Sequence, residues 1–143
     1  MQVFQPCESF RDSAEYLRRD PKRLGKQAVE LYQIYKAVLA KIEGRKHGYE
    51  NHPMVIHIYN NGRPYNIFEY IDELNRVWFE LGYKRSEEFL NNILELKNRL
   101  SPYFTDEPYK KFFCWGKNCS YDDVCNKYKK LLDYKRNIKN QMF

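Results

Sequence analysis

The sequence lacks the features that mark secreted and membrane proteins. Residues 1–7 show no basic segment followed by an apolar one, which a secretory signal would require. No run of 18 apolar residues occurs, so no helix is expected to span a membrane. These absences predict an intracellular protein, located in the cytoplasm, in a host cell or, for a eukaryotic source, in the nucleus.

Short catalytic motifs are also missing. The chain contains no Walker motif and no GxGxxG, HExxH or GxSxG pattern, so nothing in it indicates nucleotide hydrolysis, dinucleotide binding, zinc peptidase or serine hydrolase chemistry. Cysteine is sparse, and its four residues form no CxxC pair: Cys7, Cys114, Cys119 and Cys125. We therefore expect reduced free thiols, with a zinc or iron–sulfur site as the alternative.

The three histidines give little support to a metal site. His47, His52 and His57 lie within one polar stretch, but no carboxylate or cysteine stands at a known ligand spacing from them. We therefore expect no metal and no organic cofactor.

Basic and aromatic residues are abundant. The 143 residues predict a single domain, and they carry a net charge of +6 and 17% aromatic residues. Lysine and arginine exceed aspartate and glutamate by ten to six in residues 1–47 and by nine to three in residues 108–143, whereas residues 48–107 have six against ten. If the two ends fold onto one face, they would form a basic surface suited to a polyanion such as DNA.

Apolar residues recur at helical spacing through most of the chain. We expect a compact all-α domain of four to five helices, with Leu94 and Leu131 facing inward. Asp20 with Pro21 is a strong helix start, and Gly25 would permit the close approach of another backbone. Residues 54–59 could form a short strand or a helical turn. The expected helices cover residues 9–19, 21–43, 66–82, 86–100 and 120–140, with long irregular loops at 44–64 and 102–117.

Glu30 is the main candidate for a catalytic group. It follows Arg23, Lys26 and Gln27 on one helix, and it lies at the edge of the apolar stripe of that helix. One interpretation is a solvated glutamate that pairs with Lys26 four residues earlier. The other gives the carboxylate an acid, base or electrostatic role beside cationic groups.

Three further segments are candidates for DNA contacts. The basic run of Arg18, Arg19, Lys22, Arg23 and Lys26 could bind phosphates or form a solvated face. Asn51 and His52 lie in a loop that could present polar groups. Aromatic residues 112, 113 and 115 alternate with lysines, which fits either base stacking or completion of the core. The candidate DNA-binding residues are Arg19, Lys22, Arg23, Lys26, Gln27, Asn51, His52, Lys111 and Trp115.

Three short motifs resemble one family in the same order along the chain. These are Arg-Leu-Gly-Lys-Gln-Ala-Val-Glu at residues 23–30, Asn-His-Pro-Met-Val at residues 51–55, and Trp-Phe-Glu-Leu-Gly-Tyr at residues 78–83. Together they resemble the pyrimidine dimer DNA glycosylases of the phage endonuclease V type over roughly residues 1–115. The first motif is the most specific of the three.

The resemblance implies a base-excision mechanism on double-stranded DNA by a monomer without a cofactor. In this family the N-terminal α-amine, here that of Met1, attacks C1′ of the damaged nucleotide and forms a Schiff base that can lead to strand cleavage. Glu30 falls at the position of the assisting glutamate. Arg23 and Lys26 would hold phosphates, and the segment near Trp115 would contact DNA.

Two positions depart from the family pattern. The bulky Gln2 should prevent removal of Met1, and Val29 stands where an arginine is expected. The tail from residue 119 to 143 has no counterpart that we can place. The substrate could therefore be a modified base other than a pyrimidine dimer. The competing hypothesis is a catalytically silent DNA- or protein-binding module on the same fold.

Overall fold

A computed structural model describes the backbone of residues 1–113 and 120–141 and the side chains as far as residue 134. Six α-helices and two short 3-10 turns make up this part of the chain, and it contains no strand, which confirms the predicted all-α class. The number of helices exceeds the prediction because residues 53–59 form a helix of their own. The helices are α1 (Phe10–Leu17), α2 (Pro21–Ile42), α3 (Pro53–Tyr59), α4 (Phe68–Glu80), α5 (Glu87–Leu100) and α6 (Tyr121–Gln141), and the turns are Asn60–Gly62 and Ser101–Tyr103.

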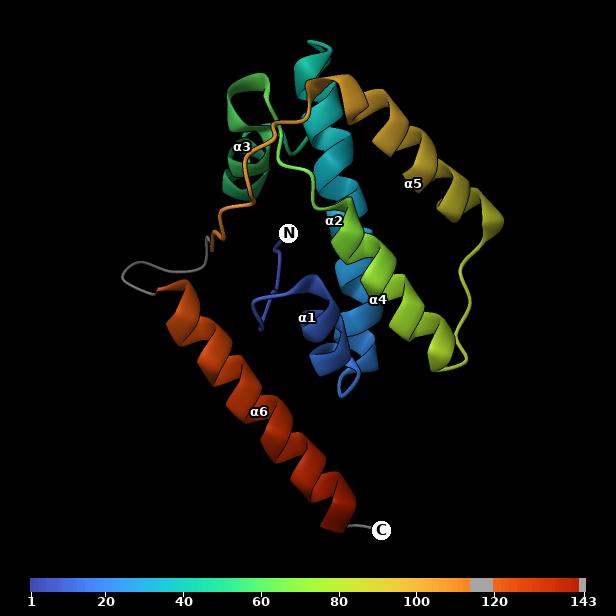
Figure 1. Ribbon diagram of the computed structural model, residues 1–143, viewed down its shortest axis with the longest axis vertical. Coiled ribbons are helices and arrows are strands. Elements are labelled where there is room, and N and C mark those ends of the chain that lie inside the picture. Colours follow the sequence, from blue (N-terminus) through green and yellow to red (C-terminus); the bar gives the residue numbers. More distant parts are fainter. Residues whose placement is uncertain (114–119, 142–143) are drawn as a thin grey trace.

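Helix α2 forms the centre of the domain, with α3, α4 and α5 packed around it (Figure 1). It begins where the sequence predicted, because the Asp20 side chain accepts a hydrogen bond from the Arg23 backbone N–H at 3.3 Å and Pro21 occupies the first turn. The apolar stripe of α2 is fully buried, so only the remaining faces of this helix can make contacts outside the core. That stripe comprises Leu24, Ala28, Leu31, Ile34, Tyr35 and Val38.

Gly25 lets an aromatic side chain approach α2. We expected a backbone at this position, but the neighbour is the indole ring of Trp78 on α4, and a Cβ on residue 25 would lie 2.6 Å from it. The ring cannot retreat easily, because it stacks on Tyr83 at a centroid distance of 4.3 Å and its N–H donates to the Lys84 carbonyl at 3.0 Å. The glycine therefore sets the distance between α2 and α4.

Replacing this glycine tests the packing. Gly25→Ala should lower the free energy of unfolding by about 1–2 kcal/mol, since overpacking of about 1–3 kcal/mol outweighs the helix propensity gained. Urea denaturation of the purified protein measures this change. Gly48→Ala is the control, because no atom lies within 4 Å of its added Cβ. A Gly25→Ala protein as stable as the wild type would show that the indole ring of Trp78 moves aside for the added Cβ without cost.

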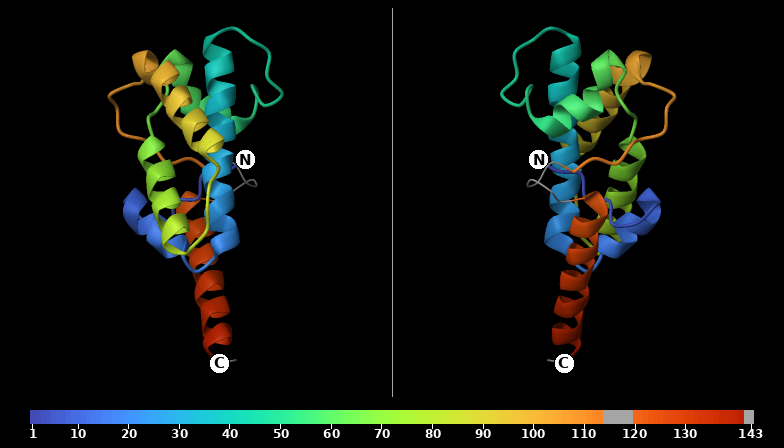
Figure 2. Two further views of the ribbon diagram at one scale, coloured as in Figure 1. Left: turned by 90° about the vertical axis from the view of Figure 1, so that its right-hand side faces the viewer. Right: turned by 90° about the vertical axis from the view of Figure 1, so that its left-hand side faces the viewer.

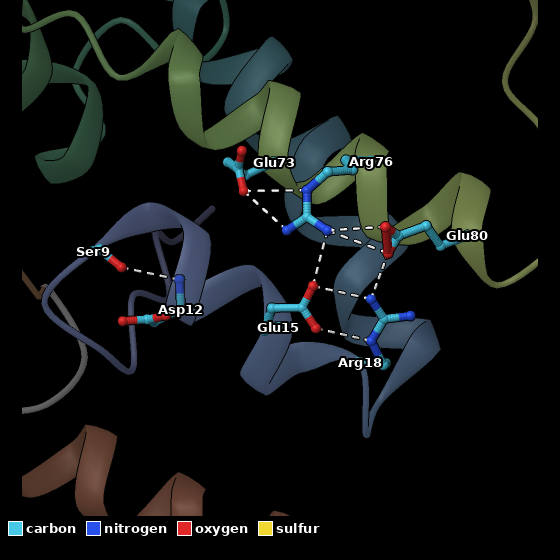
Figure 3. Close-up of polar contacts among 7 residues, drawn as sticks. All are labelled: Ser9, Asp12, Glu15, Arg18, Glu73, Arg76 and Glu80. Atoms are coloured by element: carbon cyan, nitrogen blue, oxygen red, sulfur yellow. Dashed lines mark hydrogen bonds and ion pairs between the residues drawn. The ribbon is translucent and has the colours of Figure 1, made fainter.

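An ion-pair network joins α1 to α4 (Figure 3). Arg76 contacts Glu15 at 2.9 Å, Glu73 at 3.0 Å and Glu80 at 3.1 Å. Arg18 contacts Glu15 at 3.0 Å and Glu80 at 2.6 Å. Hydrogen bonds from Arg18 and then Arg76 lower the pKa of Glu15 to about 2. Arg18, part of the basic run, therefore serves this network.

Helix α6 packs against the N-terminal segment, so the two basic ends of the chain lie together. The Tyr121 hydroxyl donates to the Gln5 carbonyl at 2.5 Å, and Leu132 is buried against the core. The prediction that Leu131 packs inward is wrong, because 47% of it is exposed. Leu94 on α5 is also exposed, at 58%, against the prediction. Neither side chain is covered by the part of the chain that the structure describes.

No helix in residues 1–113 and 120–141 combines the length and apolar character needed to cross a bilayer.

Candidate functional site

Glu30 is buried, with one carboxylate oxygen that has no partner. Only 8% of the residue is exposed. Its Oε1 lies 3.9 Å from the Arg23 guanidinium and 4.0 Å from the Lys26 ammonium, whereas the buried Oε2 accepts no hydrogen bond from any residue that the structure describes. A buried oxygen without a partner costs about 1–3 kcal/mol, so a native protein rarely keeps one without a reason. The geometry is not that of a solvated surface glutamate.

The basic residues around Glu30 differ in how accessible they are. Lys22 and Lys26 are exposed on the first turns of α2. Arg23 is less exposed, and its guanidinium lies over the Phe4 ring at 5.2 Å. Arg19 forms an ion pair with Asp133 of α6. Of the residues predicted to bind phosphates, Lys22 and Lys26 are thus the most accessible. Arg19 could bind a phosphate only by giving up its ion pair with Asp133.

Gln27 holds the N-terminal segment against α2. Its side chain is fully buried; its carbonyl oxygen accepts from the Phe4 N–H at 2.8 Å, and its amide donates to the Gln2 carbonyl at 2.8 Å. The chain from Met1 to Phe4 therefore runs antiparallel to α2, toward the start of that helix, where Phe4 lies beside Arg23 (Figure 1). Figures 1 and 2 place the N-terminus beside the middle of α2.

The Met1 amine lies near His52, the residue that caps α3. Burial lowers the pKa of His52, and the positive charge of the N-terminal amine lowers it further. The Nδ1 of His52 accepts the Met54 N–H at 3.1 Å, an acceptor role that an unprotonated nitrogen fills. The structure therefore places the Met1 amine near His52 and holds residues 2–4 against Gln27, which precedes Glu30 by three residues on α2.

Other predicted residues lie at different places. Asn51 is exposed directly before His52. Lys111 contacts the Glu8 carboxylate at 3.3 Å and the Cys7 carbonyl at 3.4 Å. Trp115, Cys114 and Cys119 lie outside the described residues.

The aromatic segment before Trp115 packs against the domain. Phe112 stacks on His57 with a centroid distance of 4.7 Å, and Phe113 meets Phe4 edge-on at 6.0 Å. Of the two interpretations of these rings, base stacking or completion of the core, the structure favours the core for both.

Sequence reasoning missed one residue at the site. The Tyr128 hydroxyl of α6 donates to the Asp20 carboxylate at 3.1 Å, and its ring lies 4.7 Å from the Phe4 ring. Burial and then Asp20 raise the pKa of Tyr128, so the hydroxyl stays protonated and remains a donor. No local pattern in the sequence indicates a contact made 108 residues away.

Comparison with known proteins supplies the family. No curated protein and no solved structure matches the chain. The sequence model of the pyrimidine dimer DNA glycosylases matches residues 1–91, which include α1 to α4, the Gln27 contacts, Glu30 and His52. The match covers well over half of the chain, and the predicted resemblance is confirmed: the chain belongs to the pyrimidine dimer DNA glycosylase family.

Proposed function

We propose that this protein is a DNA glycosylase with abasic-site lyase activity that excises damaged or modified bases, with pyrimidine dimers as the first substrate to test. Family membership supports the class of reaction. The observation that carries the proposal is the buried Glu30 carboxylate, whose Oε2 has no partner on the side of α2 along which the N-terminal segment lies. Because no donor among the described residues engages this oxygen, the negative charge of the carboxylate remains available to stabilise positive charge that develops on a bound sugar.

The proposed reaction begins with the Met1 amine. Its nitrogen forms a bond to C1′ of the damaged nucleotide while the glycosidic bond breaks, and the base leaves with its electron pair and takes up a proton. Opening of the sugar ring then gives an imine between Met1 and C1′. Loss of a proton from C2′ expels the 3′ phosphate and cleaves the strand. Glu30 stabilises the cationic sugar and transfers protons in these steps.

The surrounding residues would hold the DNA and the amine. Lys22 and Lys26 are exposed and suited to phosphates beside the extruded nucleotide, with Arg23 close to Glu30. Asn51 and His52 would contact the nucleotide from the side of α3. Gln27 acts indirectly in this scheme, because both ends of its amide hold the N-terminal segment.

The second candidate is a catalytically silent DNA-binding module. Two observations favour it: Val29 stands where the family pattern has an arginine, and Gln2, only 3% exposed, is a bulky second residue that should retain Met1. An amine carried by a methionine is more hindered than one carried by a small residue. Such a protein would bind DNA through the same surface but would not catalyse base excision.

Borohydride trapping distinguishes the two. The protein is incubated with duplexes that carry a cyclobutane dimer, other modified bases or an abasic site, and borohydride then reduces any imine to a stable amine. We expect a covalent adduct whose cross-linked peptide begins at Met1. A protein acetylated at its N-terminus is the control and should form none. Intact DNA binding without an adduct on any substrate would favour the silent module, and an adduct at a lysine would relocate the nucleophile.

A further inference from the structure

The exposed flank of α6 lies outside the part of the chain that the family model matches. That match ends at residue 91, and α6 begins at Tyr121. The helix nevertheless docks beside the proposed site, since Tyr128 contacts both Asp20 and Phe4. In Figure 2 its C-terminal half extends past the turn between α1 and α2, with no other helix beside it. The C-terminal half of α6 could therefore contact another molecule.

Two exposed lysines lie on or directly beside the flank of α6 that is next to Tyr128. Positions 124, 127, 131 and 134 follow one another on this flank, because steps of three and four residues return to the same face of a helix. Lys127 is exposed there, and Lys130 lies on the adjoining outer face. Leu131 and Tyr134 stand beside them with exposed fractions of 47% and 63%. The flank is thus both cationic and aromatic.

The charge on this flank is not neutralised by the protein. Neither Lys127 nor Lys130 takes part in any ion pair with the residues that the structure describes. Asp133 is engaged by Arg19, and Asp123, one turn before Lys127, forms no ion pair with it. From residue 124 to the end of α6 the sequence has one acidic residue, Asp133, and six basic ones: Lys127, Lys129, Lys130, Lys135, Arg136 and Lys139.

The flank also continues a basic surface of α2. Tyr128 contacts Asp20, the residue that caps α2, and exposed Lys22 follows two positions later. Tyr128 therefore brings α6 to the start of α2, where Lys22 directly precedes Arg23 and lies about one turn before Lys26. A phosphate backbone that passes Lys22 and Lys26 would meet α6 next.

We propose that this flank of α6 is a second contact with duplex DNA, which extends the footprint beyond the lesion. The inference rests on the proposed function for the identity of its partner. Lys127 and Lys130 bind backbone phosphates, and Tyr134 packs against the sugar edge of the groove. Such contacts carry no sequence information, so they lengthen the time that the protein spends on undamaged DNA as well as at a lesion.

The test is the salt dependence of binding to an undamaged duplex, measured by fluorescence anisotropy between 50 and 200 mM KCl. The plot of log K against log salt for the full-length Lys127→Ala/Lys130→Ala protein should be shallower by about 2 than that of the wild type, since each phosphate contact adds about 0.9 to the slope. Lys127→Arg/Lys130→Arg should restore the slope. Lys36→Ala/Lys97→Ala, with the same change of charge on α2 and α5 away from α6, should leave it unchanged.

Two results would overturn the inference. One is an unchanged slope for the α6 variant. The other is a concentration-dependent dimer of the wild type that Leu131→Ser/Tyr134→Ser abolishes while DNA binding stays intact, which would assign the flank to a protein contact. Because the assay uses undamaged DNA, it separates this inference from the proposed function. A shallower slope together with no borohydride adduct would support the α6 contact and reject the glycosylase.

Discussion

Glu30→Gln is expected to slow base release by about 10²–10⁴-fold, because the amide cannot accept a proton and carries no charge to stabilise a cationic sugar. The substitution preserves the size of a side chain that is only 8% exposed, so packing should be maintained. It also removes a negative charge near Arg23 and Lys26, which should leave DNA binding intact or strengthen it. Single-turnover base release from a lesion-bearing duplex and equilibrium binding to the same duplex give the two readouts.

Glu43 provides a matched control for this experiment. It lies at the other end of α2, where it pairs with Arg45 and Arg99 on the surface. Glu43→Gln makes the same chemical change at the opposite end of α2 from the proposed site, so its rate of base release should match that of the wild type. If Glu30→Gln releases base at the wild-type rate, Glu30 has no part in the mechanism. If both variants are slow, the effect is structural.

The helices could be predicted from the sequence wherever a local signal was sufficient. The apolar stripe of α2, its Asp20 cap and the helix expected at residues 86–100 all follow from spacing over a few residues, and the structure confirms them. Helix α3 remained undecided because its apolar run of residues 54–59 is too short for periodicity to separate a helix from a strand. Leu131 was misplaced because an apolar residue at helical spacing does not reveal whether a neighbour covers it.

The candidate site could be predicted only in part, for a related reason. Glu30 was identified from its cationic neighbours and from the family motif, both of which are contained in eight residues of sequence. That its Oε2 is buried without a partner depends on packing from several elements, and no local pattern encodes it. The contacts of Gln27 with Phe4 and of Tyr128 with Asp20 span 23 and 108 residues, and a single sequence does not show such pairs.

Gln27→Ala is expected to uncouple the Met1 amine from Glu30. The truncation removes the two hydrogen bonds that Gln27 makes with the Phe4 N–H and the Gln2 carbonyl, which should lower the free energy of unfolding by about 2–4 kcal/mol. Well below the melting temperature the protein should still be folded. Its N-terminal segment would then no longer be held along α2, and the rate of borohydride trapping on an abasic duplex should fall by about 10²-fold, as is typical when a reacting group is misplaced by about 1 Å.

The decisive comparison is between rate and binding in two variants of α2. Gln33→Ala truncates an exposed glutamine on the same helix and should change neither stability nor trapping. For Gln27→Ala the maximal trapping rate should fall while the DNA concentration at half-maximal rate stays close to the wild-type value, because the exposed lysines of α2 are untouched. Loss of binding would mean that Gln27 contacts DNA directly. Trapping at the wild-type rate by a folded Gln27→Ala protein would show that the amine reaches C1′ without being held, and a role for Gln27 in positioning it would be excluded.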